Sequence, residues 1–328
     1  MHVFLTGASG YIGSAVADRL RAAGHVVSGL ARSDTAASRL PAAGIQPIRG
    51  NFTDPRSMGA AARSADGVIS MATTYDPNVD GPAIGAMLAA LAGSNKPMIY
   101  ASGIWSHGDT AGKVVDETSP PRPATLVQWR QAVEERVLDA AREGIRTVVI
   151  RPAIVYGRGG GIPAEFVDFA RKEGGARFVG TGQNRWPFVH VDDLADLYLL
   201  ALERAPAGTL LLAVNGPSYP VKEVAAAASR GVGAGDVRLR GRSRRPGRRL
   251  GPMPMRWCSI SRLWVSEPRS SSAGAPAGPM SSLTSSMDHI SRRDRQVRQA
   301  AGQDGLEGSA FLLCRVHRHK HSGSAPHS

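Results

Sequence analysis

Three glycines near the start of the chain have the spacing of a phosphate-binding turn. Gly7, Gly10 and Gly13 follow an apolar run at residues 1–5 and lead into a helical pattern at residues 11–23. The first glycine permits a tight turn off a strand, the second lets backbone amides approach a pyrophosphate, and the third lets the helix pack closely on the sheet. The N-terminus of such a helix presents unpaired N–H groups to an anion. Because a strand precedes the turn and a helix and second strand follow it, the pattern favours a dinucleotide site over an ordinary glycine loop.

Short apolar strands alternate with helical patterns over residues 1–235. The expected strands are residues 3–5, 25–31, 45–49, 67–72, 97–101 and 147–151. The expected helices lie near residues 11–23, 34–43, 55–64, 82–93, 125–143, 163–173, 192–203 and 220–229. This alternation predicts a doubly wound α/β fold, in which a parallel sheet is covered by helices on both faces.

Further motifs follow the glycine turn in order along the chain. They are Gly50-Asn51-Phe52-Thr53-Asp54, the strand at 67–72, Ser102-Gly103, the RPAIVYG segment at 151–157 and the FVHVDDLA segment at 188–195. With the spacing GxxGxxG, these motifs resemble the extended short-chain dehydrogenase/reductases, also called the NAD-dependent epimerase/dehydratase superfamily. The resemblance covers residues 1–235. It implies a Rossmann-type fold with a small substrate-binding lobe, formed mainly by residues 157–235.

The resemblance also implies a nicotinamide dinucleotide as cofactor. The residues expected to bind it are Gly7, Ser9, Gly10, Tyr11, Ile12, Gly13, Arg32, Ser33, Asn51, Phe52, Met71, Ala72 and Arg130. Asn51 and Phe52 are expected near the adenine, although an aspartate is more usual where Asn51 stands.

An arginine and a serine stand where the second strand ends. Arg32 and Ser33 follow it, and no carboxylate occupies the position that binds the ribose hydroxyls of NAD. A guanidinium matches phosphate geometry, and an arginine at this place accommodates the 2′-phosphate of NADP. The sequence therefore favours NADP(H). The alternative, a solvated arginine at the start of the next helix, leaves NAD open.

The catalytic pattern of the family is incomplete in this chain. The family uses a tyrosine four residues before a lysine, with a serine or threonine nearby, because a positive charge lowers the pKa of the phenol. None of the six tyrosines is followed four places later by a lysine. Counting back from Arg151 places Leu126 at the tyrosine position, Arg130 at the lysine position and Glu134 one turn later. Leu126 cannot transfer a proton, and Arg130 stays protonated.

Other residues are candidates for the missing chemistry. Ser102 or Gly103 falls at the serine position, so Ser102 and Arg130 are expected to stabilise an oxyanion. His107, whose imidazole suits proton transfer near neutral pH, or water is the expected proton source. Tyr75, in the loop after the fourth strand, is a second candidate. The alternative for both His107 and Tyr75 is an ordinary loop residue without a catalytic role.

These observations predict an NAD(P)-dependent oxidoreductase or an epimerase/dehydratase-like enzyme. Its substrate is expected to be a small carbonyl compound or a molecule like a sugar nucleotide. The alternative is a non-catalytic NADP(H)-binding regulator that signals redox state through partners. The missing tyrosine favours the regulator, whereas the retained substrate lobe with Asp192 and Asp193 favours the enzyme.

The net charge of +13 is distributed unevenly along the chain. Residues 1–235 carry 23 Lys and Arg against 21 Asp and Glu, and residues 236–328 carry 17 against 6. The second segment is rich in Ser, Ala, Pro and Gly without apolar periodicity, which predicts a disordered basic tail. Because it lacks interleaved aromatic residues, specific nucleic-acid binding is not expected.

Several classes of protein are disfavoured by what the sequence lacks. It has no run of about 18 apolar residues and no signal-peptide pattern, so a cytoplasmic protein without membrane association is expected. Both cysteines, Cys258 and Cys314, lie in the tail, and no Cys/His cluster before the tail predicts a metal site. Family members commonly pair through the fourth and fifth helices, so a homodimer is a further expectation.

A second interpretation of the tail is a shifted reading frame. Members of the family usually end with a segment like LDQ…GW.P. One choice of codons for residues 257–261 encodes V-L-D-Q in another frame, and residues 272–276 can then encode R-W-R-P. The nucleotide sequence would decide between the two interpretations.

Overall fold

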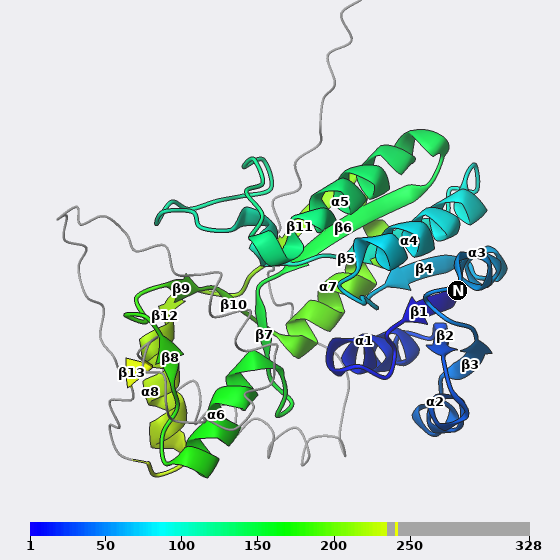
Figure 1. Cartoon of the computed structure of the whole chain (residues 1–328). Coiled ribbons are helices and arrows are strands. Elements are labelled where there is room, and N and C mark those ends of the chain that lie inside the picture. The colour runs from blue at the N-terminus through cyan, green and yellow to red at the C-terminus, as the bar shows by residue number, and fades with distance from the viewer. Residues whose placement is uncertain (235–239, 242–328) are drawn as a thin grey trace, which may run out of the picture. The chain divides into compact units, whose positions relative to one another are not determined.

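The computed structural model describes residues 1–234 and 240–241 (Figure 1). These residues belong to two compact units. The first contains residues 1–158 and 187–218, and the second contains residues 159–186, 219–234 and 240–241. The predictions made for the tail, including the shifted frame and both cysteines, concern residues outside this described part, apart from Arg240 and Gly241.

The first unit is built on a seven-stranded parallel sheet with the order β11-β6-β5-β4-β1-β2-β3. Its strands are β1 (His2–Thr6), β2 (Val26–Ala31), β3 (Gln46–Arg49), β4 (Gly67–Ser70), β5 (Pro97–Ala101), β6 (Arg146–Pro152) and β11 (Thr209–Ala213). The chain runs outward from β1 to β3, then returns to start the other half at β4. The switch point between β1 and β4 is where open α/β sheets bind ligands, outside the carboxyl ends of the strands.

Helices cover both faces of this sheet, as predicted. They are α1 (Tyr11–Ala22), α2 (Asp34–Arg39), α3 (Pro55–Ser64), α4 (Pro77–Leu91), α5 (Trp129–Asp139) and α7 (Val191–Arg204). Helix α1 packs against α7, while α3 and α5 pack on either side of α4. Successive strand residues point to opposite faces, and both members of pairs such as Phe4 and Leu5 are fully buried. The doubly wound α/β fold expected from the sequence is therefore confirmed.

Helix α4 and strand β11 differ from the sequence prediction for identifiable reasons. Helix α4 begins at Pro77, not near residue 82, because the Asp76 carboxylate caps it by accepting a hydrogen bond from the Asn78 N–H at 2.9 Å. Strand β11 was not predicted, because its short apolar run follows a helix closely and has no periodicity of its own. A parallel pair outside the main sheet, β7 (Ile154–Tyr156) and β10 (Phe188–His190), completes the first unit.

The second unit is small and contains two helices within its described residues. Helix α6 (Gly161–Glu173) packs against α8 (Val221–Gly231). Short strand pairs join β9 (Arg185–Trp186) to β12 (Tyr219–Pro220), and β8 (Phe178–Val179) to β13 (Arg240–Gly241). The rings of Phe166 and Trp186 meet edge to face at 6.2 Å in its core. The pairing of β13 extends the described structure past the predicted boundary at residue 235.

Candidate active site

The glycine turn joins β1 to α1 at the switch point of the sheet. Gly7 has φ of +78°, and its carbonyl accepts a hydrogen bond from the Gly10 N–H at 2.9 Å. A Cβ atom at Gly13 would lie 2.0 Å from the Gly7 carbonyl oxygen, so this position requires glycine. Gly10 caps α1 without a side-chain hydrogen bond, and the first turn contains no acidic residue. The first N–H groups of α1 are thus left for an anion.

A threonine that the sequence analysis missed holds the strand beside this turn. The Thr6 hydroxyl oxygen accepts hydrogen bonds from the backbone N–H groups of Met71 and Ala72, both at 3.0 Å. Thr6 is fully buried at the end of β1. A polar residue within a buried apolar strand was the available signal. Its bonds place Met71 and Ala72 next to the turn, where the sequence predicted cofactor contacts.

The residues after β2, where the sequence predicts contacts with a 2′-phosphate, are an exposed arginine and a serine that caps the next helix. Arg32 is exposed and makes no ion pair with any other described residue. The Ser33 hydroxyl caps α2 by accepting a hydrogen bond from the Ala36 N–H at 3.2 Å, which leaves its own proton free to donate. The only carboxylate of this segment, Asp34, is ion-paired with Arg49 at 2.6 Å.

The two residues expected near the adenine differ in exposure. Asn51 is exposed, and its side-chain oxygen accepts a hydrogen bond from the Thr53 N–H at 3.1 Å. Phe52 is 3% exposed and belongs to the hydrophobic core with Met58. Its burial does not favour the contact with the adenine that was expected from the sequence.

A buried ion pair lies at the carboxyl ends of β5 and β6. The Arg151 Nε donates to both oxygens of Glu134, at 3.2 and 3.1 Å, and Nη2 donates to Oε2. Both side chains are less than 6% exposed. The hydroxyls of Ser102 and Ser106 donate to Oε1 of the same carboxylate. Because the Ser102 hydroxyl donates its hydrogen bond to Glu134, this geometry favours a positioning role for Ser102 over the oxyanion contact expected from the sequence.

His107 is part of the same buried network. Its Nε2 accepts a hydrogen bond from Arg151 Nη1 at 3.0 Å, which places the ring proton on Nδ1. Burial lowers the pKa of His107 below its usual value, and the neighbouring Arg151 charge lowers it further. The imidazole is thus neutral and 4% exposed, an environment that does not favour the expected role as proton source.

Arg130 stands apart from this network although it is equally buried. It is 7% exposed, and it forms no hydrogen bond or ion pair within the described residues. Its guanidinium carbon lies 5.3 Å from the ring centroids of Tyr75 and Trp129. A Cβ atom added at Gly103 would lie 3.9 Å from Arg130 Nη1, so the guanidinium lies at the carboxyl end of β5.

Tyr75 is held against Arg130 by an unusual loop after β4. Its φ of +61° is rare for a bulky residue. The loop is anchored by Asp80, 2% exposed, which accepts hydrogen bonds from the Thr73 hydroxyl at 2.5 Å and from the Thr74 N–H at 2.9 Å and hydroxyl at 2.6 Å. The sequence analysis missed this anchor, because nothing local marks a carboxylate within an apolar helix as buried.

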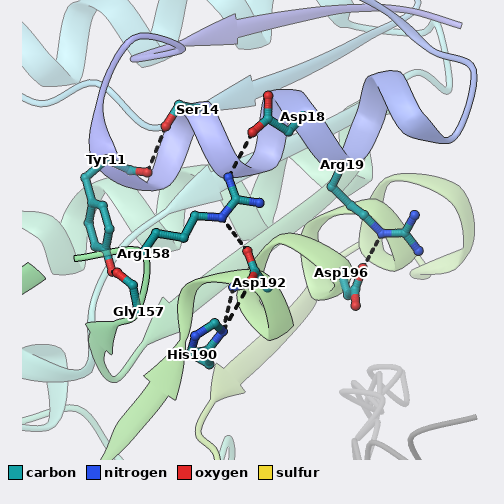
Figure 2. Close-up of polar contacts among 9 residues, drawn as sticks. All are labelled: Tyr11, Ser14, Asp18, Arg19, Gly157, Arg158, His190, Asp192 and Asp196. Atoms are coloured by element: carbon teal, nitrogen blue, oxygen red, sulfur yellow. Dashed lines mark hydrogen bonds and ion pairs between the residues drawn. The ribbon is translucent and has the colours of Figure 1, made fainter. Parts of the chain in front are cut away.

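A polar network ties the start of α1 to the segment after β7 (Figure 2). The Tyr11 hydroxyl donates to the Gly157 carbonyl at 2.7 Å, and Arg158 bridges Asp18 at 2.8 Å and Asp192 at 2.7 Å. Burial, followed by the Asp192 charge, raises the pKa of Tyr11 to about 12. Tyr11 is thus a structural hydrogen-bond donor here and remains protonated at neutral pH.

Two kinds of feature are absent from the described residues. No helix there has the length and apolar character needed to cross a bilayer. That part of the chain also has no group of three or more His, Cys, Asp or Glu side chains arranged to hold a metal ion.

Comparison with known proteins supplies the family. The model of the NAD dependent epimerase/dehydratase family matches residues 3–213. An uncharacterized protein of Schizosaccharomyces pombe, C2A9.02, is 34% identical over 69% of this chain and 78% of its own length. A 2-alkyl-3-oxoalkanoate reductase of Stenotrophomonas maltophilia is 27% identical over 71% of this chain and 76% of its own.

A solved structure shows the same fold. The UDP-glucose 4-epimerase of Thermus thermophilus in complex with NAD matches with a TM-score of 0.60 and 22% identity, over 71% of this chain and 84% of that chain. The glycine turn, the switch-point geometry and the matched family model agree. This chain belongs to the NAD dependent epimerase/dehydratase family.

Proposed function

We propose that this chain binds NADP(H) and reduces a small carbonyl compound. The proposal depends on two groups that both lie at the carboxyl ends of the strands. One is the N-terminus of α1, which has no side-chain cap, and the other is the buried Arg130, which has no ion-pair partner in the described residues. The first suits a pyrophosphate, and the second suits an oxygen that gains negative charge during reaction.

The cofactor would be held largely by backbone groups. The N–H groups of the first turn of α1 would bind the pyrophosphate, and the exposed Arg32 would pair with a 2′-phosphate. The Ser33 hydroxyl retains a proton that it can donate to the same phosphate. A bound nicotinamide would supply hydride. The S. maltophilia relative is named as a reductase, and the T. thermophilus structure contains NAD, both of which support this class of chemistry.

Reduction suits the side chains better than epimerisation or dehydration. Those reactions begin by oxidising a hydroxyl group, which requires a residue that accepts its proton. Leu126 occupies the family's tyrosine position and cannot do this, and Arg130 stays protonated. Reduction instead develops negative charge on the carbonyl oxygen, which a fixed guanidinium stabilises in a site shielded from water.

The proton for the reduced oxygen would come from Tyr75 or from water. Tyr75 is 40% exposed beside Arg130, whereas His107 is 4% exposed and held by Arg151. Exposure lets the Tyr75 hydroxyl recover a proton from solvent after each turnover. Ser102 and Glu134 would position the surrounding loop without touching the substrate.

The test is calorimetric titration of the full chain with NADPH, NADP+, NADH and NAD+, followed by a screen of aldehydes and ketones for NADPH oxidation. We expect NADPH to bind more tightly than NADH, and Arg32→Ala to remove that preference without weakening NADH binding. Failure of all four nucleotides to bind would contradict the proposal. Binding without turnover of any carbonyl would favour the non-catalytic redox regulator.

A further inference from the structure

Arg130 forms no ion pair with any described acidic side chain. The two buried carboxylates of the described residues, Glu134 and Asp80, are already engaged. Glu134, one helical turn away, is bound by Arg151 through both carboxylate oxygens. Asp80 accepts hydrogen bonds from Thr73 and Thr74. A buried charge without a partner is costly, so a protein that maintains one gains from an anionic ligand.

The contacts that Arg130 does make leave its hydrogen-bonding groups unused. Its charge lies near the rings of Tyr75 and Trp129, and these cation–π contacts consume none of its five N–H donors. Its Nε is buried and has no partner within the described residues. A planar guanidinium held in this way is preorganised for a carboxylate, which matches it with two parallel hydrogen bonds.

Other unpartnered donors lie on the neighbouring segments. Trp129 Nε1 precedes Arg130 at the start of α5, and Trp105 Nε1 and His107 Nδ1 lie on the 3-10 helix η2 (Ile104–His107). Each is buried and has no partner among the described residues. The chain leading into α5 is joined to η2 by a hydrogen bond from the Ala124 N–H to the Trp105 carbonyl at 3.0 Å. All of these groups are hydrogen-bond donors, as are the N–H groups of Arg130.

We propose that Arg130 is the receptor for a carboxylate of the substrate, so that the protein acts on carbonyl compounds that carry an acid group. This inference rests on the proposed reductase function for its identification of the ligand as substrate. One guanidinium has enough donors to contact both a carboxylate and a carbonyl oxygen one or two carbons away. A 2-oxo or 3-oxo acid therefore fits the site, and a neutral ketone leaves the buried charge unpaired.

Binding of a matched pair of unreactive probes tests the inference. Hexanoate and hexanamide have the same chain and differ in charge, and neither can be reduced. Titrated calorimetrically into the full chain, with and without NADP+, hexanoate is expected to bind at least ten times more tightly than hexanamide. Arg130→Gln should abolish this preference, and Arg130→Lys should retain part of it because the charge is kept.

Controls separate this result from general charge effects and from misfolding. Arg142→Gln is the matched control. Arg142 precedes β6, at the amino ends of the strands, and its side chain is 67% exposed, so this variant should leave the preference for hexanoate unchanged. Thermal unfolding of each variant reports its fold. Equal binding of the two probes to the unaltered protein would overturn the inference. It would also be overturned if Arg130→Gln lost NADP+ binding but still preferred hexanoate to hexanamide. Failure of every nucleotide to bind would refute the reductase function alone, because hexanoate binding without cofactor is measured separately.

Discussion

The glycine turn and the start of α5 both lie at carboxyl ends of strands in one sheet, but they are constructed differently. The turn presents backbone N–H groups, and its geometry depends on the absence of side chains at Gly7 and Gly13. The region around the start of α5 presents side chains. Arg151 on β6 is ion-paired there, whereas Arg130 on α5 has no ion pair within the described residues, and both are buried. A site made of backbone can be recognised from local sequence, whereas a site made of side chains depends on which residues the fold brings together.

The largest expected effect is on the backbone-built region. Gly13→Val places a side chain against the Gly7 carbonyl oxygen, so the turn must move, and we expect NADPH binding to be abolished in calorimetry. Gly85→Ala is the matched control, because a Cβ there meets nothing within 4 Å inside α4. It should preserve binding and stabilise the protein by about 0.5–1 kcal/mol. Unchanged NADPH affinity in Gly13→Val would break the assignment of the turn.

The second prediction tests whether the two buried arginines really differ. Glu134→Ala leaves Arg151 buried without its partner, and we expect the free energy of unfolding in urea to fall by about 3–5 kcal/mol. Arg130→Gln removes a charge that has no partner in the described residues and should not destabilise the ligand-free protein. Glu135→Ala, at an exposed neighbouring position, should change stability by less than about 0.5 kcal/mol. If Glu134→Ala and Arg130→Gln lowered the free energy of unfolding by similar amounts, the distinction between the two arginines would not hold.

The third prediction concerns the proton source beside Arg130. Tyr75→Phe keeps the aromatic ring near the guanidinium but removes the hydroxyl, and we expect kcat for carbonyl reduction to fall on the order of 10²-fold. The affinity for hexanoate should be unchanged, because the cation–π contact remains. An unaltered kcat would assign the proton to water.

The smallest effect is expected in the exposed network of Figure 2. Arg158→Ala breaks the ion pairs to Asp18 and Asp192, whose side chains are 53% and 50% exposed. Such exposed pairs contribute about 0–1 kcal/mol, so the urea midpoint should shift only slightly and less still in high salt. A loss of stability comparable to that of Glu134→Ala would show that this exposed network stabilises the first unit as much as the buried one.

The sequence by itself determined the parallel α/β architecture and the glycine turn. Both follow from local chemistry, because apolar runs of strand length and a missing Cβ act the same way wherever the chain places them. The sequence also predicted that Leu126 and Arg130 stand where the family has its tyrosine and lysine. Only the tertiary structure decided what the remaining side chains do. Ser102 was expected to contact the substrate, yet its hydroxyl donates a hydrogen bond to Glu134, thirty-two residues away in the chain.

The same dependence on distant partners explains the other differences. His107 was chosen for its usual pKa, but burial beside Arg151 lowers that pKa and keeps the ring neutral. Arg130 and Arg151 are the same residue type with similar burial, and no local pattern tells the paired one from the unpaired one. Hydrogen bonds and ion pairs act over a few ångströms in space, so the fold determines which donors and acceptors meet and which are left for a ligand.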